Sequence, residues 1–339
     1  MTVIGFMHHR KKPTNRAYAF AAVAKTEGAE LLYFSPGKVD FQTKKIKGFV
    51  YRSGGWIKIT SDFPDVVCNV VGFSKDSQNK TVEKLSGIIP FTSYSVGTKA
   101  TVYNNITRYN KFANYLVPTV KVTSAKQFLD LLARYKEIVF KPSSGCQGTN
   151  VYYVEKENEG FRVLAGADKA NWGLGQIQDF IQEKISTGEY LVQPYINCRT
   201  KRGDPYDLRL HVQKGARGEW VITKIYPRIA ESGSIVCNLS RGGHTLELVP
   251  FLKREFGSGY LDVQKSVEIF SLQLAAHMDT LQKDIYNEEL DELGIDIGLD
   301  AGRKIWIYEI NWRPGCPPSL NIELNVVRNA ILYAMSLVK

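Results

Sequence analysis

Cysteine is scarce in this 339-residue chain, and no apolar run is long enough to cross a membrane. The five cysteines are widely spaced and include no Cys-x-x-Cys pair, which disfavours a disulfide framework, a zinc site and a redox centre. We therefore expect reduced, structural thiols. No apolar stretch approaches the roughly 18 residues of a membrane span, and residues 2–7 lack the basic region of a signal peptide. We expect a cytoplasmic protein with no transmembrane helix.

Negative charge is also in short supply. The chain has 34 Asp and Glu against 44 Lys and Arg, which gives a formal net charge of +10. This excess implies an anionic partner, and ATP, an acidic substrate, an anionic polymer or nucleic acid would each satisfy it. The basic residues are dispersed and no recognised nucleic-acid motif is present, so nucleic acid is disfavoured. The hydrophobic content of 44% is ordinary for a globular protein of two or three lobes.

The apolar pattern divides the chain into three units. Residues 1–103 alternate short apolar runs with helical stretches, which predicts a small α/β domain. Residues 104–190 contain a capping-box helix start at Ser124 to Gln127, then a strand that leads into a glycine-containing loop. Residues 191–339 contain a long amphipathic helix, a pair of strands and a closing helix from about Leu320. The expected fold class is α/β and α+β.

The strand pair near the C-terminal end carries a cluster of acidic and amide side chains. Two apolar runs, 293–299 and 305–310, are joined by a short turn and are predicted to pair. Glu309 and Asn311 lie two residues apart and so share one face, and Asp296 lies on the neighbouring strand. Together they offer the all-oxygen ligands that Mg²⁺ takes beside nucleotide phosphates. The alternative is a pair of carboxylates exposed on the surface.

A lysine precedes a loop of small residues at 138–152. Ser144, Gly145 and Gly148 allow backbone N–H groups to approach phosphate oxygens, and Lys141 supplies a fixed positive charge. The segment is not a P-loop, because Gly-x-x-x-x-Gly-Lys-Ser/Thr is absent. We interpret it as a flap that covers phosphates, with a simple β-hairpin turn as the alternative.

An apolar run broken by one proline, residues 190–196, is typical of a chain that crosses between lobes. Its backbone could read an adenine edge at Gln193, while Tyr195 or Ile196 packs on the ring. A buried strand with no ligand is the other reading of this run.

Several arginines follow. Asp207 and Arg209 share one face of an alternating strand, and Arg228 falls on a later strand. A loop with two glycines then brings Asn238 and Arg241 toward an anion. Such a cluster suits the charge that develops on a transferring phosphoryl group, whereas any single arginine is more often a solvated surface charge.

These elements occur in one order: a lysine loop, a crossing segment, an arginine and Gly-Gly loop, and an Asp followed by Glu-x-Asn-x-x-Pro-Gly. In this the chain resembles the ATP-grasp superfamily of carboxylate-amine ligases over residues 105–339. Asp207 to Arg209 and residues 238–243 look like elements of the branch that modifies ribosomal proteins with glutamate. Residues 51–56 and 63–67 look closer to the YheC/YheD group, which is associated by name with the endospore coat of bacilli.

The resemblance implies a fold and a set of site residues. The fold would be an N-terminal α/β pre-ATP-grasp domain followed by two lobes that clamp ATP. Asp296, Glu309 and Asn311 would bind two Mg²⁺ ions, with Mn²⁺ a possible substitute. The implied nucleotide-binding residues are Lys111 and Lys141 with Ser144, Gly145 and Gly148 at the phosphates, and Gln193, Tyr195 and Ile196 at the adenine. The implied catalytic residues are Arg209, Arg228, Arg241 and Asn238. Gln193 departs from the acidic residue that the family often carries near the ribose.

The implied reaction joins a carboxylate-bearing substrate to an amine nucleophile. The carboxylate attacks the γ-phosphate of Mg-ATP to give an acyl phosphate and ADP, and the amine then displaces phosphate to leave an amide. The amine could belong to an amino acid, a peptide or a protein tail. Two alternatives stay open: a kinase of the same fold that phosphorylates a small hydroxyl compound, and a spore-coat or assembly protein that binds ATP without turning it over.

Overall fold

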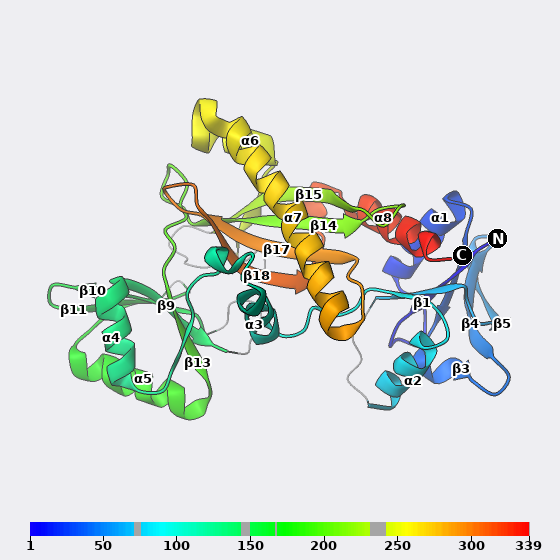
Figure 1. Ribbon diagram of the computed structural model, residues 1–339, viewed down its shortest axis with the longest axis horizontal. Coiled ribbons are helices and arrows are strands. Elements are labelled where there is room, and N and C mark those ends of the chain that lie inside the picture. Colours follow the sequence, from blue (N-terminus) through cyan, green and yellow to red (C-terminus); the bar gives the residue numbers. More distant parts are fainter. Residues whose placement is uncertain (71–75, 144–149, 167, 231–241, 339) are drawn as a thin grey trace.

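The computed structural model describes residues 1–70, 76–143, 150–166, 168–230 and 242–338. Within these ranges the strands form three sheets of seven, six and five strands. Figure 1 shows them in a row along the long axis, with the first sheet at one end and the second at the other. Within the described ranges, helices long and apolar enough to cross a membrane are absent.

The N-terminal sheet is mixed and has the order β3-β4-β2-β1-β6-β7, with β5 added to β4. Its core strands β1, β2, β6 and β7 run parallel, while β3, β4 and β5 form an antiparallel extension. Helix α1 begins after Thr14, whose side chain accepts a hydrogen bond from the Ala17 N–H. The elements are β1 (Val3–Met7), α1 (Asn15–Thr26), β2 (Glu30–Phe34), η1 (Pro36–Lys38), β3 (Val39–Asp40), β4 (Lys45–Arg52), β5 (Gly55–Asp62), β6 (Val66–Asn69), α2 (Asp76–Ser86) and β7 (Phe91–Thr92).

The middle sheet is antiparallel, in the order β12-β11-β10-β9-β13-β8. Helices α4 and α5 pack on it through Phe128, Ile177 and Ile181, which share one buried core with the strand residue Phe140. As predicted, α4 begins after Ser124, whose side chain accepts from the Gln127 N–H, but the Gln127 side chain accepts from the Thr123 N–H and not from the Ser124 N–H of a full capping box. The elements are β8 (Val120–Val122), α4 (Ala125–Tyr135), β9 (Glu137–Pro142), β10 (Tyr152–Glu157), β11 (Gly160–Ala165), β12 (Asp168–Trp172), α5 (Leu174–Thr187) and β13 (Tyr190–Pro194).

The third sheet has the order β16-β15-β14-β17-β18 and carries the largest core. Helix α7 packs on it along the apolar face that the sequence predicts, with Val267, Phe270 and Leu274 buried. The elements are β14 (Tyr206–Lys214), β15 (Trp220–Ile229), β16 (His244–Thr245), α6 (Leu248–Phe256), η4 (Gly257–Gly259), α7 (Tyr260–Tyr286), β17 (Glu292–Leu299), β18 (Ile305–Trp312) and η5 (Pro318–Leu320).

Two helices pack differently from what the units expected from the sequence imply. Helix α3 (Lys99–Tyr109), which precedes η2 (Ala113–Tyr115), spans position 103/104, and its residues Val102 and Ile106 belong to the core of the third sheet. The closing helix α8 (Glu323–Ser336) places Val327 and Ile331 in the core of the N-terminal domain, where it packs against α1. The C-terminal end of the chain therefore helps to build the first domain.

Candidate active site

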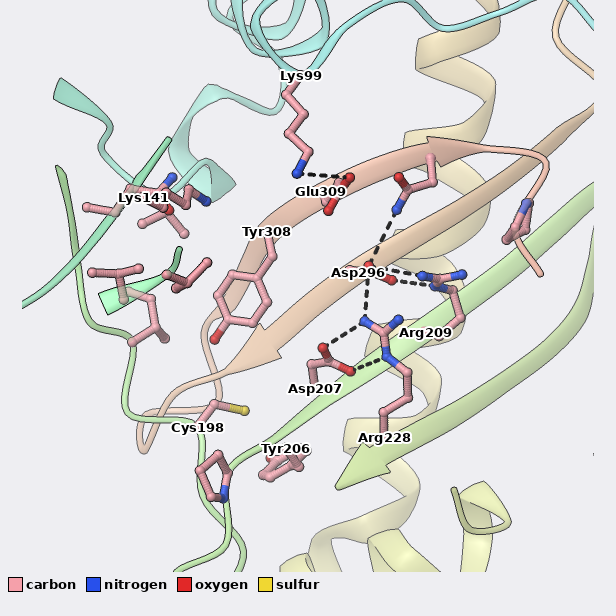
Figure 2. Close-up of a pocket in the computed structure, with 18 of the residues that line it drawn as sticks. Lys99, Lys141, Cys198, Tyr206, Asp207, Arg209, Arg228, Asp296, Tyr308 and Glu309 are labelled. Carbon is pink, nitrogen blue, oxygen red and sulfur yellow. Dashed lines mark hydrogen bonds and ion pairs between the residues drawn. The ribbon is translucent and has the colours of Figure 1, made fainter. Parts of the chain in front are cut away.

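A cavity of about 760 Å³ lies where the middle and third sheets face each other. Residues of β9 and β13 line one side, and residues of β14, β15, β17 and β18 line the other. Figure 2 shows how charged side chains from both sides point into this space. The cavity is therefore assembled from segments far apart in the sequence.

The hairpin of β17 and β18 brings Asp296, Glu309 and Asn311 together. Asp296 is opposite Glu309 in the ladder, Gly294 is opposite Asn311, and all three polar residues line the cavity. The Asn311 side-chain amide donates to Asp296 Oδ2 at 3.4 Å. The register then shifts so that Ile297 pairs with Ile307, which leaves Tyr308 as the extra residue of a bulge. This bulge, which the sequence did not reveal, lets adjacent residues 308 and 309 both line the cavity.

Two glycines leave room around Asp296. Gly294, Asp296 and Gly298 share one face of β17, while Ile295 and Ile297 point into the core. A Cβ on Gly294 would lie 2.5 Å from Pro314 Cβ, and one on Gly298 would lie 2.1 Å from the Tyr308 hydroxyl. Both glycines are needed because neighbouring side chains occupy the space that a larger residue would fill.

Asp296 lies in a buried network of two carboxylates and two guanidinium groups, seen at the centre of Figure 2. Arg209 Nε donates to Asp296 Oδ1, and Arg209 Nη2 donates to Oδ2 at 3.1 Å. Arg228 binds Asp207 through two hydrogen bonds of 2.7 Å and approaches Asp296 Oδ2 at 3.0 Å. The sequence placed Asp207 and Arg209 on one face but did not indicate that each arginine is held by a carboxylate.

The network shifts the pKa values of its carboxyl groups in opposite directions. Burial acts to raise the pKa of Asp296, but Arg209 and Arg228 together hold it below its usual value. Burial raises the pKa of Asp207 to about 6, and the negative charge of Asp296 opposes the effect of Arg228 there. Asp296 is thus the more firmly ionised of the two carboxylates.

Two lysines reach the same cavity from other elements. Lys99 is the first residue of α3, and its ammonium lies 3.4 Å from Glu309 Oε1. Lys141 is on β9, and burial lowers its pKa to about 8, with the charge of Lys99 adding to the effect. The two cations therefore lie close to each other at one end of the cavity (Figure 2).

Lys111 is not among the residues that line this cavity, contrary to what the resemblance implied. Its ammonium lies 5.8 Å from the centre of the Phe112 ring and acts electrostatically on His277 of α7. The reason is that α3 ends at Tyr109, so the chain has turned before it reaches Lys111. Lys99 lines the cavity instead. The sequence signal that could have found it is Thr98, which caps the helix just before this lysine.

The connector expected at the adenine is both a strand and a cavity wall. Residues 190–194 form β13 of the middle sheet, and Gln193, Tyr195 and Ile196 line the cavity. Gln193 Nε2 donates to Thr119 Oγ1 at 2.7 Å, which fixes the side-chain amide. The run is therefore a strand whose end borders the cavity, and the adenine contact stays a prediction.

Five of the expected site residues lie outside the described residues: Ser144, Gly145 and Gly148 of the flap, and Asn238 and Arg241 of the later loop. So do Cys146 and Cys237, while the described cysteines Cys68, Cys198 and Cys316 are free thiols. The flap residue that the structure does describe, Lys141, is in the cavity.

The donor set suits magnesium in its chemistry. Asp296, Glu309 and Asn311 offer only oxygen ligands toward a shared cavity, which is what a hard divalent cation requires. Both oxygens of Asp296 already accept from arginines, so a cation there would share this carboxylate with them. Glu309 forms an ion pair with Lys99 alone in the described part of the chain and is the more accessible of the two carboxylates.

Comparison with known proteins gives a consistent result. The profile of the YheC/D like ATP-grasp family matches residues 88–337. Endospore coat-associated protein YheC of Bacillus subtilis (strain 168) is 26% identical over 340 residues, which cover 95% of this chain and 91% of YheC. Endospore coat-associated protein YheD of the same organism is 25% identical over 305 residues, which cover 85% of this chain and 65% of YheD.

Among solved structures, ATP-grasp ligase PsnB, complexed with a phosphomimetic variant of minimal precursor, Mg and ADP, has a similar fold. The TM-score is 0.57 and the identity 12%, with 100% of this chain and 99% of that chain covered. At this identity the likeness concerns the fold alone. The architecture, the profile match and the relatives agree: the chain has the ATP-grasp fold and belongs to the YheC/D-like ATP-grasp family.

Proposed function

We propose that the protein is an ATP-dependent ligase that joins a carboxylate to an amine. A carboxylate oxygen would bond to the γ-phosphorus of ATP as the bond to the β–γ bridging oxygen breaks, giving an acyl phosphate and ADP. An amine nitrogen would then bond to the acyl carbon as phosphate leaves and the amine loses a proton. The observation that carries this proposal is that two lysines, two arginines and three oxygen-donor side chains surround one cavity.

The lysines are suited to the phosphates of ATP. Lys99 and Lys141 lie near each other, and a bound anion would favour the charged form of Lys141, which burial and the charge of Lys99 disfavour in the free protein. Gln193 to Ile196 would border the adenine, with Thr119 holding the Gln193 amide in place. Asp296, Glu309 and Asn311 would hold Mg²⁺, which when bound neutralises charge on the phosphoryl group during transfer.

The arginines are suited to the reacting groups. Asp207 and Asp296 bind Arg209 and Arg228 through Nε and Nη2 and so fix the orientation of both guanidinium planes. The Nη1 group of each has no hydrogen bond to a described residue, so each can donate to a phosphoryl or carboxylate oxygen. Fixed donors of this kind stabilise a transition state because they need no reorganisation.

A carboxylate acceptor fits this cavity better than a hydroxyl acceptor. A hydroxyl group must lose its proton to a base, whereas a carboxylate is ionised at neutral pH. The described lining contains no histidine, and its three carboxyl groups, Asp207, Asp296 and Glu309, are all ion-paired. We therefore favour the ligase over the kinase of the same fold.

The test is an ADP-release screen in which amino acids and short peptides are supplied in pairs with Mg-ATP. The expected result is ADP formation that depends on both substrates, together with a product whose mass equals the sum of the two substrates minus one water. The matched control is Glu309→Gln, which should abolish the signal. A phosphorylated product would show a kinase, and ATP binding without turnover over the whole screen would show a non-catalytic protein.

A further inference from the structure

A second cavity of about 500 Å³ lies on the N-terminal domain, apart from the candidate active site. Its lining includes five lysines from four segments: Lys11 and Lys12 after β1, Lys38 in η1, Lys47 in β4, and Lys58 in β5. Figure 1 places β4 and β5 at the end of the molecule opposite β10 and β11. This second cavity therefore belongs to a different domain from the candidate active site.

Most of the excess positive charge lies in this domain. Residues 1–98 contain 14 Lys and Arg against seven Asp and Glu, an excess of seven within a chain whose net charge is +10. ATP bound between the other two lobes cannot account for this charge, because exposed charges are screened within about 10 Å. An anionic partner of the N-terminal domain itself would account for it.

The five lysines have no acidic partners among the described residues. The nearby acids are engaged elsewhere: Glu30 binds Arg52 and Asp62 binds Lys45, each at 2.7 Å, and Asp40 accepts from the backbone of Gln42 and Thr43. The charge of Lys47 helps to lower the pKa of the Asp40 carboxyl group, but the two side chains form no ion pair. The cavity rim therefore carries uncompensated positive charge.

The floor of the cavity is apolar. Phe49 of β4 is half-buried and lies opposite Lys58 of β5 in the ladder, so ring and ammonium share one face of the sheet. Tyr33 lies beneath and donates to the backbone carbonyls of Arg10 and Lys12 at 2.8 and 2.9 Å. These two hydrogen bonds fix the loop that carries Lys11 and Lys12, which line the cavity. A ligand would meet apolar surface in the middle and ammonium groups at the edge.

We propose that this cavity binds a short acidic peptide segment, with carboxylates at the lysines and an apolar side chain on Phe49. The volume lies within the range of sites that bind small ligands. Lysine provides mobile point charges that match several separate carboxylates, while the planar fork of arginine that suits phosphate is absent from the lining. Nucleic acid fits less well, because successive bases stack on several exposed rings, whereas Tyr33 and Phe34 are 1% exposed and Phe49 is the one partly exposed aromatic side chain of the described lining.

The experiment measures fluorescence anisotropy of a labelled peptide of alternating Glu and Leu, titrated with the full-length protein at low salt. We expect binding that weakens as salt increases, that saturating Mg-ATP leaves unchanged, and that is lost with a Gln-Leu peptide. The double variant Lys47→Glu/Lys58→Glu should weaken binding by about tenfold or more. The control Lys25→Glu/Lys80→Glu makes the same charge change at exposed lysines of this domain outside the cavity.

Equal losses in the two double variants would overturn the proposal, because binding would then depend on net charge alone. Tighter binding of inorganic triphosphate or of an oligonucleotide of the same charge would overturn the peptide assignment. The affinity for Mg-ATP, measured on the same variants, should not change. This separates a failure here from a failure of the proposed ligase function, which the acidic-peptide site does not require.

Discussion

At the scale of single residues, Asp296 is the centre of the candidate site because it joins the two arginines to the oxygen ligands. A buried carboxylate with two guanidinium partners stays ionised, whereas removal of one partner would leave an uncompensated buried charge. Glu309, by contrast, is partly exposed, and among the described residues it forms one ion pair, with Lys99. The two carboxylates therefore differ in what their loss would cost.

Glu309→Gln tests the oxygen-ligand assignment. The substitution keeps the shape of the side chain and removes its charge, so the fold should persist, and turnover should fall by at least about 100-fold as electrostatic stabilisation is lost. Steady-state rates over a range of Mg²⁺ concentrations, with a melting curve for stability, provide the measurement. Asp262→Asn, in the first turn of α7 and outside the cavity, is the matched control. Normal turnover of the Glu309 variant would refute the assignment.

The lowered pKa of Lys141 predicts that ATP affinity depends on pH. Because its pKa is lowered to about 8, it loses its charge in the free protein above that pH. Bound phosphate favours the charged form, so binding above pH 8 must take up a proton, and affinity should fall by up to about tenfold per pH unit. Below pH 8 this dependence should vanish.

Isothermal titration with Mg-ATP between pH 7 and pH 9.5 measures the effect of Lys141. Lys141→Arg is the control, since arginine stays charged over this range and should flatten the dependence. A wild-type affinity that does not change up to pH 9.5 would show that Lys141 does not contact the phosphates.

At the scale of elements, β17 combines two requirements on alternate residues. Its isoleucines fill the core of the third sheet, while its glycines admit Pro314 and Tyr308 to the cavity side. The bulge in β18 adds the residue that fills the space over Gly298. The hairpin thus shapes the cavity wall as well as carrying Asp296, Glu309 and Asn311.

Gly298→Ala should therefore destabilise the protein. The added Cβ would lie 2.1 Å from the Tyr308 hydroxyl, so the ring must move, at a cost of about 1–3 kcal/mol in the free energy of unfolding. Chemical denaturation measures this change in the free energy of unfolding. Gly175→Ala is the matched control. Gly175 lies in α5, where an added Cβ would meet no atom within 4 Å apart from the helix's own backbone, so the substitution should be neutral or slightly stabilising. Equal effects of the two substitutions would refute the steric explanation.

At the scale of the whole molecule, α8 connects the two ends of the chain. Val327, Ile331 and Ala334 complete the core of the N-terminal domain, and Arg328 forms an ion pair with Glu27 at 2.6 Å. On its other side, α8 accepts a hydrogen bond from the Gln213 side chain of β14 at the Val326 carbonyl. The helix therefore fixes the first domain onto the third sheet.

Ile331→Ala should destabilise the N-terminal domain although it lies near the C-terminal end. The side chain is 0% exposed, and its truncation in a packed core costs about 2–5 kcal/mol. Hydrogen exchange should show faster exchange in β1 and β2. The control Leu324→Ala lies on the same helix at 64% exposure and should have little effect. Unchanged exchange in the first domain would contradict this role of α8.

The sequence predicted well those features that depend on local spacing. The strand pair with Glu309 and Asn311 on one face, the cap at Ser124 and the apolar face of α7 all follow from periods of two or 3.6 residues. It predicted less well those features that depend on where a chain turns. Lys111 matched a motif but lies beyond the end of α3, whereas Lys99 reaches the cavity. Asp207 and Arg228, 21 residues apart, gave no sign of their pairing.

The sequence by itself determined the hairpin that carries Asp296, Glu309 and Asn311, the order of the elements and thereby the family, because each rests on residue types at fixed short separations. Only the tertiary structure decided which lysines share the cavity, which carboxylates hold the arginines, and that α8 belongs to the first domain. These are contacts between residues distant along the chain. Their geometry depends on how sheets pack and strands bulge, which local periodicity does not specify.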